Sequence, residues 1–239
     1  MLKKIISLIL LLAMLTCLFS GCKLQNERTE LIVFAAASLE EPLTELRKLY
    51  LSEHPEIPIR FYFDSSGTLK NAILNGANCD IFISAGQRQM DELDIKADSS
   101  VNTEEVDRVV TETRFNILEN KVVLVVPADN PANIHSFDDL LVGLEEGSVL
   151  LAMGNSDVPV GQYTQELLEY YGIDATALEK SGCITYGSNV NEVTTQVSEG
   201  LVDCGIIYAT DAFSAGLTVV DTATEEMCGQ VLYPAARLK

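Results

Sequence analysis

Four segments of the chain contain residues whose types and positions are suited to binding an anion without a charged side chain. Each follows a short apolar run and precedes a helical pattern, so we expect four strand-to-helix junctions. A helix start leaves backbone N–H groups without intrahelical partners, and the positive end of its dipole attracts negative charge. Three of the segments add a hydroxyl. The four segments are Ala37-Ser38-Leu39, Ser65-Ser66-Gly67-Thr68, Pro159-Val160-Gly161-Gln162 and Gly187-Ser188-Asn189-Val190, of which only the third has no hydroxyl.

The donors of these junctions favour one class of ligand. In open α/β sheets, ligands bind beyond the carboxyl ends of the strands, which is where the junctions lie. Neutral donors that converge on one point suit a fully deprotonated, multiply charged oxyanion. A protonated anion such as hydrogen phosphate would also need an acceptor for its proton, usually a carboxylate.

Enzymatic chemistry has little support in the sequence. The two histidines, His54 and His135, lie in polar surroundings typical of surface residues. The motifs G-x-S-x-G, H-E-x-x-H and G-x-x-x-x-G-K-[ST] are absent from the sequence. The serines of the junctions have no evident general base, and no Cys/His cluster predicts a metal site. We therefore expect a binding protein without a cofactor or a directly ligated metal ion.

The elements that position the junctions alternate between strand-like and helix-like segments. The longest β-branched run covers residues 121–127, and the alternation restarts after it. Two such rounds predict an α/β fold of two lobes, with mainly parallel sheets and a ligand cleft between the lobes. We expect residues 31–117 and 214–239 to form lobe I and residues 118–213 to form lobe II.

Two of the junctions have the spacing of a capping box, in which an N-cap side chain and a glutamate three residues later satisfy helix N–H groups. Ser38 with Glu41 and Asn189 with Glu192 both fit this spacing. At the second junction either Ser65 or Ser66 is suited to cap the helix, and the other hydroxyl is then left for a ligand.

Composition excludes one large class of partners. The chain has 239 residues, 47% of them hydrophobic, and a formal net charge of -19. A nucleic-acid partner is not expected, because phosphate binding needs a basic surface. An anion site in so acidic a chain must be made by local donors acting against the overall field.

The first 22 residues have the order of an export leader: Lys3 and Lys4, an apolar stretch over residues 5–15, then small residues before Cys22. We expect lipid attachment at Cys22, which anchors an extracytoplasmic protein to the membrane. One alternative is lipid attachment at Cys17, although the residues before it, Leu15 and Thr16, are not both small. The other alternative is an ordinary secretory signal that is cleaved nearby. Residues 23–30 read as a polar tether.

Four cysteines follow the tether: Cys79, Cys183, Cys204 and Cys228. Cys79 and Cys204 each precede an apolar run, where a small buried hydrophobic residue fits. We favour buried thiols, although two disulfides remain the alternative in an exported chain.

Three segments resemble the signatures of the molybdate-binding proteins of ABC importers, in order and over essentially the whole mature chain. They are Phe34-Ala35-Ala36-Ala37-Ser38-Leu39, Asp80-Ile81-Phe82-Ile83-Ser84-Ala85 and Gly205-Ile206-Ile207-Tyr208-Ala209-Thr210-Asp211-Ala212. The resemblance implies a two-lobed, type II periplasmic-binding-protein-like fold. It implies that Ser38, Ser66 and Tyr208 bind the oxyanion through hydroxyls, and Val160 and Val190 through backbone amides.

The chain departs from the family pattern near these positions. Gly67 stands where the family often has serine, Val160 replaces a residue that is typically alanine, and the loop over residues 154–159 is shorter than usual. Asp211 lies near a helix start, where a carboxylate interacts favourably with the dipole, so we expect it not to be a ligand.

By resemblance, the chain is expected to capture molybdate, and tungstate as well, and to deliver it to an ABC permease as a monomer. The metal would enter as an oxyanion with no direct metal-ion ligand. The alternatives are a binding protein for another tetrahedral oxyanion such as sulfate, a sensor ectodomain on the same fold, and an extracytoplasmic enzyme.

Overall fold

The computed structural model describes residues 30–239. The predicted leader, the expected lipidation residue Cys22 and nearly all of the tether lie outside the described residues. Within residues 30–239, none of the helices combines the length and the apolarity needed to cross a membrane.

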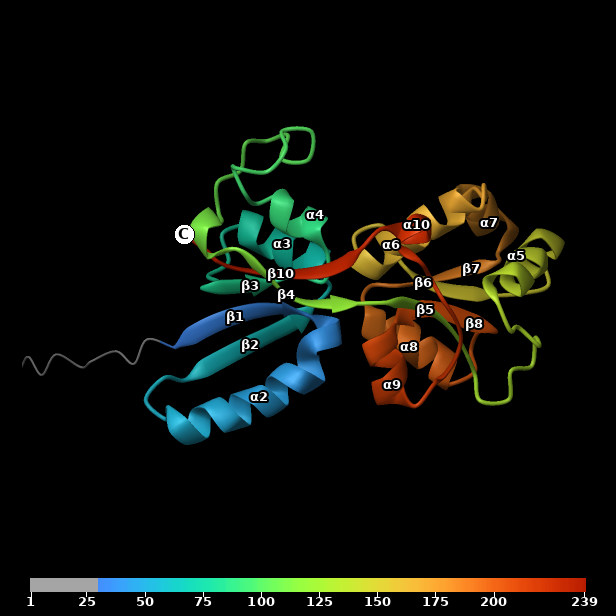
Figure 1. Cartoon of the computed structure of the whole chain (residues 1–239), viewed down its shortest axis with the longest axis horizontal. Coiled ribbons are helices and arrows are strands. Elements are labelled where there is room, and N and C mark those ends of the chain that lie inside the picture. Colours follow the sequence, from blue (N-terminus) through green and yellow to red (C-terminus); the bar gives the residue numbers. More distant parts are fainter. Residues whose placement is uncertain (1–29) are drawn as a thin grey trace, which may run out of the picture.

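The described chain forms two lobes, each built on a five-stranded sheet (Figure 1). The first sheet has the order β2-β1-β3-β10-β4, and the helices α3 and α4 lie on the side opposite α2 (Figure 1). Its elements are β1 (Leu31–Ala36), η1 (Ala37–Leu39), α2 (Glu40–Glu53), β2 (Ile59–Asp64), α3 (Ser66–Leu74), β3 (Ile81–Ile83), α4 (Gln87–Asp91), η2 (Thr111–Thr113), β4 (Phe115–Asn120) and β10 (Val231–Arg237).

The second sheet has the order β7-β6-β8-β5-β9, with α6 and α7 on one side and α8 and α9 on the other (Figure 1). All residues of β5 and β8 are buried, as their continuous apolar sequences predict. The elements are β5 (Val122–Val126), α5 (Phe137–Glu146), β6 (Leu151–Gly154), α6 (Pro159–Tyr170), α7 (Ala175–Ser181), β7 (Ile184–Gly187), α8 (Val190–Ser198), β8 (Cys204–Tyr208), α9 (Ala209–Ala215), β9 (Thr218–Thr222) and α10 (Glu225–Cys228).

Strand direction brings the carboxyl ends of both sets of parallel strands to the lobe interface. In the first sheet only β10 runs against its neighbours, and in the second sheet only β5 does. Strand β4 leaves the first lobe toward the second, so β1, β2 and β3 end on that side as well. Strand β5 enters the second lobe, so the antiparallel β8 ends facing the first lobe, as do β6, which is parallel to β8, and β7, which is parallel to β6. Ligands of open α/β sheets bind at such ends.

The predicted α/β fold of two lobes is confirmed, but the predicted lobe boundaries differ from the strand pairing. Strand β4 stays in the first sheet up to Asn120, and β9 pairs with β5 in the second sheet. The chain therefore crosses between the sheets at residues 120–122 and returns only at 229–231, just before β10. The expectation that residues 214–239 all belong to lobe I is wrong for β9, because its backbone completes the edge of the second sheet.

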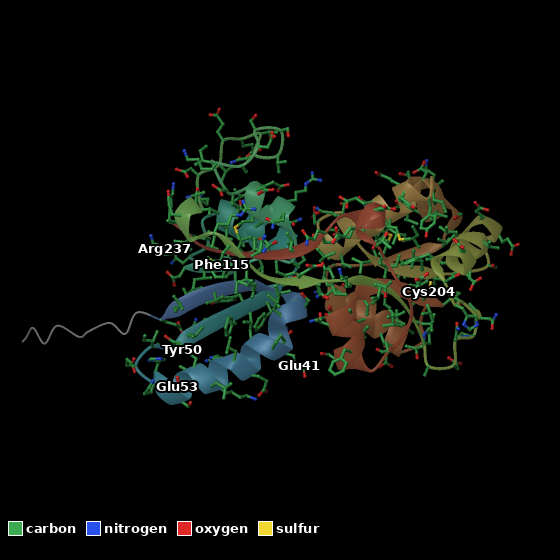
Figure 2. All side chains as sticks on the ribbon, in the orientation of Figure 1. Glu41, Tyr50, Glu53, Phe115, Cys204 and Arg237 are labelled. Atoms are coloured by element: carbon green, nitrogen blue, oxygen red, sulfur yellow. The ribbon has the colours of Figure 1, made fainter. Side chains whose placement is uncertain are left out.

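The four cysteines of the described chain are free thiols. Cys204 begins β8 in the second lobe (Figure 2), and Cys183 directly precedes β7. Strands β7 and β8 lie on opposite sides of β6, so these two residues are roughly 10 Å apart, beyond the reach of a disulfide. In the first lobe, Glu41, Tyr50 and Glu53 are spread along α2, which buries none of its residues completely (Figure 2).

Candidate functional site

The second junction resolves which serine caps the helix. Ser65 is the N-cap of α3, and its Oγ accepts a hydrogen bond from the Thr68 backbone N–H at 3.0 Å. Ser66, the first residue of α3, is 0% exposed, and its Oγ accepts a hydrogen bond from the Ala85 N–H at 2.9 Å. The Ser66 hydroxyl proton is therefore free to donate elsewhere, since the oxygen is already used as an acceptor.

The first junction is built differently from its prediction. Ser38 lies inside the short 3₁₀ helix η1, and no side chain caps either η1 or α2. The predicted capping box of Ser38 with Glu41 is thus wrong, because the chain enters α2 through a 3₁₀ turn. The Ser38 Oγ instead lies 3.0 Å from the hydroxyl of Tyr233, on β10.

The third junction presents a backbone donor. Pro159 is the first residue of α6, where its missing N–H costs no hydrogen bond, and Val160 follows at 0% exposure. A Cβ on Gly161 would lie 2.2 Å from the Asn155 carbonyl oxygen and 2.3 Å from that of Gly154. Only glycine therefore lets the start of α6 approach the end of β6 so closely, and Pro159 at this start lies against Gly86 of the first lobe.

The fourth junction ends in the first residue of α8, Val190. Asn189 is the N-cap, and its side chain accepts from the Glu192 N–H at 3.0 Å. The Glu192 carboxylate accepts from the Ser188 N–H at 2.7 Å, one residue before the position that a capping box uses. Helix α8 contacts η1 of the first lobe, so Val190 and Ser38 lie on facing sides of the interface.

Tyr208 ends β8 and is 1% exposed. Its hydroxyl donates to the Ala85 carbonyl oxygen across the interface, with a long separation of 3.4 Å. Burial raises the pKa of Tyr208 well above its usual value, so the group keeps its proton at neutral pH. Ser66 and Tyr208, from different lobes, thus meet at the same residue, Ala85.

Backbone N–H groups without partners are the chemical signature of this region. Among residues 30–239, no hydrogen bond engages the N–H of Ser66, Val160 or Val190. Ser66 and Val160 are completely buried, and buried N–H groups in proteins are nearly always paired. The arrangement therefore offers strong donors from both lobes to an acceptor-only ligand.

The two lobes are in direct contact around these donors. A Cβ on Gly67, in the first turn of α3, would lie 2.1 Å from the Asp157 carbonyl oxygen of the other lobe. The Gln89 side chain donates to Gln162 at 2.9 Å, and Asn191 donates to Glu40 at 3.4 Å. The structure is thus that of closed lobes, which excludes water from the donors.

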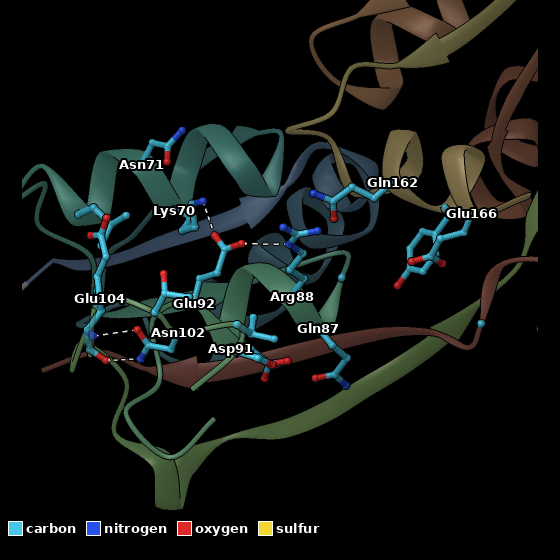
Figure 3. A pocket seen from close by; sticks show the side chains of 18 of the residues that line it. Lys70, Asn71, Gln87, Arg88, Asp91, Glu92, Asn102, Glu104, Gln162 and Glu166 are labelled. Atoms are coloured by element: carbon cyan, nitrogen blue, oxygen red, sulfur yellow. Dashed lines mark hydrogen bonds and ion pairs between the residues drawn. The ribbon is translucent and has the colours of Figure 1, made fainter. Parts of the chain in front are cut away.

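A large cleft of about 920 Å³ also opens between the lobes, but its chemistry is different (Figure 3). Its cations, Lys70 and Arg88, both form ion pairs with Glu92. The distance from Arg88 Nε to the Glu92 carboxylate is 3.1 Å. Further carboxylates, Asp91 and Glu166, line the same cleft (Figure 3). None of the five predicted ligand residues lines it, and its charges do not favour a dianion.

No group of three or more His, Cys, Asp or Glu side chains in residues 30–239 is placed to hold a metal ion. The residues that sequence reasoning missed are Ala85, Asp157, Asn120 and Tyr233. Ala85 and Asp157 act through backbone groups, which leave no side-chain signal. Tyr233 lies in an ordinary short strand pattern near the end of the chain.

The family described as bacterial extracellular solute-binding protein matches residues 31–239. A Bacillus subtilis protein, provisionally named as the ABC transporter substrate-binding lipoprotein YvgL, is 30% identical, with coverage of 93% of this chain and 82% of that protein. The molybdate-binding protein ModA of Escherichia coli is 30% identical, with coverage of 87% and 76%.

Two solved structures share the fold. The periplasmic molybdate-binding protein of Azotobacter vinelandii superposes with a TM-score of 0.70 at 20% identity, covering 88% of this chain and 86% of that one. The sulfate-binding protein SubI of Mycobacterium tuberculosis superposes with a TM-score of 0.64 at 16% identity, covering 88% and 76%. At these sequence identities the superpositions show a shared fold and do not identify the ligand.

The contact of Gly67 with Asp157 predicts that Gly67→Ala weakens oxyanion binding at least about tenfold, because the new methyl group holds the lobes apart. Stability of the unliganded protein should not fall, since alanine is a better helix former than glycine by roughly 1 kcal/mol. Calorimetric titration and chemical denaturation measure the two effects. Asn71→Ala, exposed on the same helix, serves as the control. Wild-type affinity in Gly67→Ala would contradict the predicted steric role.

The buried carboxyl of Asp211 predicts a pH dependence of stability. Burial raises its pKa to about 7 from the usual 3.8. Because the folded-state pKa is raised, the stabilising contribution is complete below about pH 4 and is lost as the pH rises through about 7. The loss is on the order of 4 kcal/mol for a shift of this size.

Asp211→Asn removes the titration, so its unfolding free energy should fall less between pH 5 and pH 8 than that of the wild type. Denaturation curves at a series of pH values measure the difference. Parallel pH profiles for the two proteins would show that Asp211 does not carry the effect.

Proposed function

Because this chain belongs to the family of bacterial extracellular solute-binding proteins, we propose that it captures molybdate, and tungstate as well, between its two lobes. The bound oxyanion would be held by the hydroxyls of Ser38, Ser66 and Tyr208 and by the N–H groups of Val160 and Val190. The closed protein would then present it to the permease of an ABC importer.

The observation that carries the proposal is the pair of buried, unpaired N–H groups on opposite lobes, those of Ser66 and Val160. An oxyanion that accepts from both would satisfy them and would join the lobes at the same time. Each such bond to a charged ligand contributes roughly 1.5–3 kcal/mol. Closure then follows from the ligand's preference for the closed state.

The hydroxyls support the same ligand class. The Ser66 oxygen already accepts from Ala85, so its proton is available to a ligand, and the protonated Tyr208 hydroxyl would exchange its long 3.4 Å bond to the Ala85 carbonyl for a bond to the oxyanion. Neutral donors favour a dianion that carries no proton of its own. Hydrogen phosphate would bring a proton that none of these groups is placed to accept.

We favour molybdate over sulfate as the ligand because of the similarity to named molybdate-binding proteins. The Escherichia coli relative is named as a molybdate-binding protein, and its likeness extends over most of both chains. Sulfate remains the second candidate, because it has the same charge and shape and a sulfate-binding protein shares the fold. A sensor ectodomain on the same fold would bind the same anion but would not be needed for its uptake.

Lipid attachment at Cys22 is part of the proposal. The Bacillus subtilis relative carries the word lipoprotein in its name, which supports an anchored, extracytoplasmic protein. Residues 23–30 would then connect the anchor to the first strand. The protein would act as a monomer beside the permease.

Titration of the protein from Lys23 onward with molybdate, tungstate, sulfate and phosphate tests this function. We expect 1:1 binding of molybdate and of tungstate, weaker binding of sulfate and none of phosphate. Binding of sulfate alone would replace molybdate by the second candidate. Binding of none would contradict the proposal.

Ser38→Ala combined with Ser66→Ala should weaken molybdate binding by roughly 3–6 kcal/mol, because each substitution removes one donor to a charged ligand. Isothermal titration of the double variant against the wild type measures the loss. Ser214→Ala, in α9 and outside the predicted ligand set, is the control. Wild-type affinity in the double variant would exclude these serines as ligands.

A further inference from the structure

We propose that Asn120 and Tyr233 are positioning residues that orient the Ser38 hydroxyl, so that its proton is directed to the bound oxyanion. The proposal rests on the oxyanion-binding function above. Both residues lie in the first sheet, Asn120 at the end of β4 and Tyr233 in β10. Tyr233 is 0% exposed, and its hydroxyl lies 3.0 Å from Ser38 Oγ and 3.2 Å from Asn120 Nδ2.

The direction of the first hydrogen bond is set by the backbone. The Asn120 Oδ1 accepts a hydrogen bond from the Lys121 N–H at 2.9 Å. Exchanging the amide oxygen and nitrogen would place two donors against each other, so Nδ2 must face Tyr233. The two N–H bonds of this amide are then donated to Tyr233 Oη and to Thr210 Oγ1, the latter at 2.9 Å.

The direction of the second hydrogen bond follows from the first. Tyr233 accepts from Asn120, and its own proton has one acceptor within reach among residues 30–239, the Ser38 oxygen. A buried hydroxyl that left its proton unpaired would lose a hydrogen bond, which is unfavourable. Burial also raises the pKa of Tyr233, so the proton stays on the phenol. Ser38 therefore accepts from Tyr233, and its own proton remains for a ligand.

The same arrangement occurs at Ser66 with a different partner. There the oxygen accepts from the Ala85 backbone N–H, which likewise leaves the hydroxyl proton free. A backbone N–H orients the Ser66 hydroxyl, whereas the Asn120–Tyr233 pair orients the Ser38 hydroxyl. A serine that is free to rotate would spend part of its time with the oxygen lone pairs toward the ligand, which would repel an oxyanion.

The chain of hydrogen bonds also reaches the second lobe. Thr210 accepts from Asn120 and donates to the Asp211 carboxylate at 3.4 Å. Asn120 lies where the chain first crosses between the sheets, so one amide contacts groups of both lobes. The orientation of Ser38 is thus established by residues that are themselves held at the crossing between the lobes.

A double-mutant cycle tests whether Tyr233 acts through Ser38. Tyr233→Phe and Ser38→Ala are made singly and together in the complete mature protein, and each is titrated with molybdate. We expect Tyr233→Phe to raise the Kd about tenfold, corresponding to the loss of one hydrogen bond's directing effect. In the Ser38→Ala protein, Tyr233→Phe should have almost no further effect, since there is no hydroxyl left to orient.

The control is Tyr163→Phe, since Tyr163 also packs beside Tyr208, with a ring-centroid distance of 6.4 Å. Within the described residues its hydroxyl forms no hydrogen bond, so its removal should leave the Kd unchanged. Asn120→Asp provides a second route if Tyr233→Phe does not fold. The carboxylate cannot donate to Tyr233, so it should attract the phenol proton and weaken molybdate binding at least as much.

Two results would overturn the positioning role: wild-type affinity in Tyr233→Phe, or an equal loss in the presence and absence of the Ser38 hydroxyl. If the wild type binds no oxyanion, the proposed function itself fails, and the positioning role in binding fails with it. The same cycle, measured as the unfolding midpoint without ligand, then shows whether the Ser38–Tyr233 bond exists. Additive shifts there would exclude the bond as well.

Discussion

A buried backbone N–H group needs an acceptor, and the arrangement of both lobes depends on this requirement. The helix starts at Ser66 and Val160 bury N–H groups that no other described residue engages. The parallel strands place these helix starts at the carboxyl ends of the two sheets. The antiparallel strands β5 and β10, which follow the two crossings between the lobes, let those ends face each other. A ligand that accepts from both sides would therefore complete the hydrogen bonding of the fold as well as close the lobes.

Neutral donors explain how a chain with a formal net charge of -19 can accommodate a dianion. A cationic side chain in the site would attract any anion. Oriented N–H and O–H donors also discriminate against an anion that carries a proton, because they cannot accept that proton. Two cations near the interface, Lys70 and Arg88, share Glu92 as their partner, and the further carboxylates Asp91 and Glu166 line the same cleft. Selectivity then depends on which way each hydroxyl points, and both serines have an oxygen occupied by a protein donor.

The sequence predicted the fold class and the four junctions, because apolar periodicity and helix-start residues are local properties. It left Ser65 and Ser66 as alternatives, since either side chain can cap a helix, and only the position of Ala85 separates them. It also assigned β9 to the wrong lobe. A short β-branched strand contains no information about which sheet edge it completes.

Long-range side-chain contacts were the least predictable part. Ser38 has the spacing of a capping residue, yet its hydroxyl contacts Tyr233, which is 195 positions away in the chain. The pattern around Tyr233 is that of an ordinary buried strand, so no local feature of the sequence distinguishes it. Likewise the need for glycine at position 67 arises from Asp157, on the other lobe.

A crystal structure of the protein grown with tungstate, with the metal located by its anomalous scattering, tests the proposed binding site most directly. We expect one strong peak between the lobes, with the oxygens of the tungstate within hydrogen-bond distance of Ser38, Ser66, Val160, Val190 and Tyr208. A peak beside Lys70 and Arg88 in the large cleft, or none between the lobes, would contradict it.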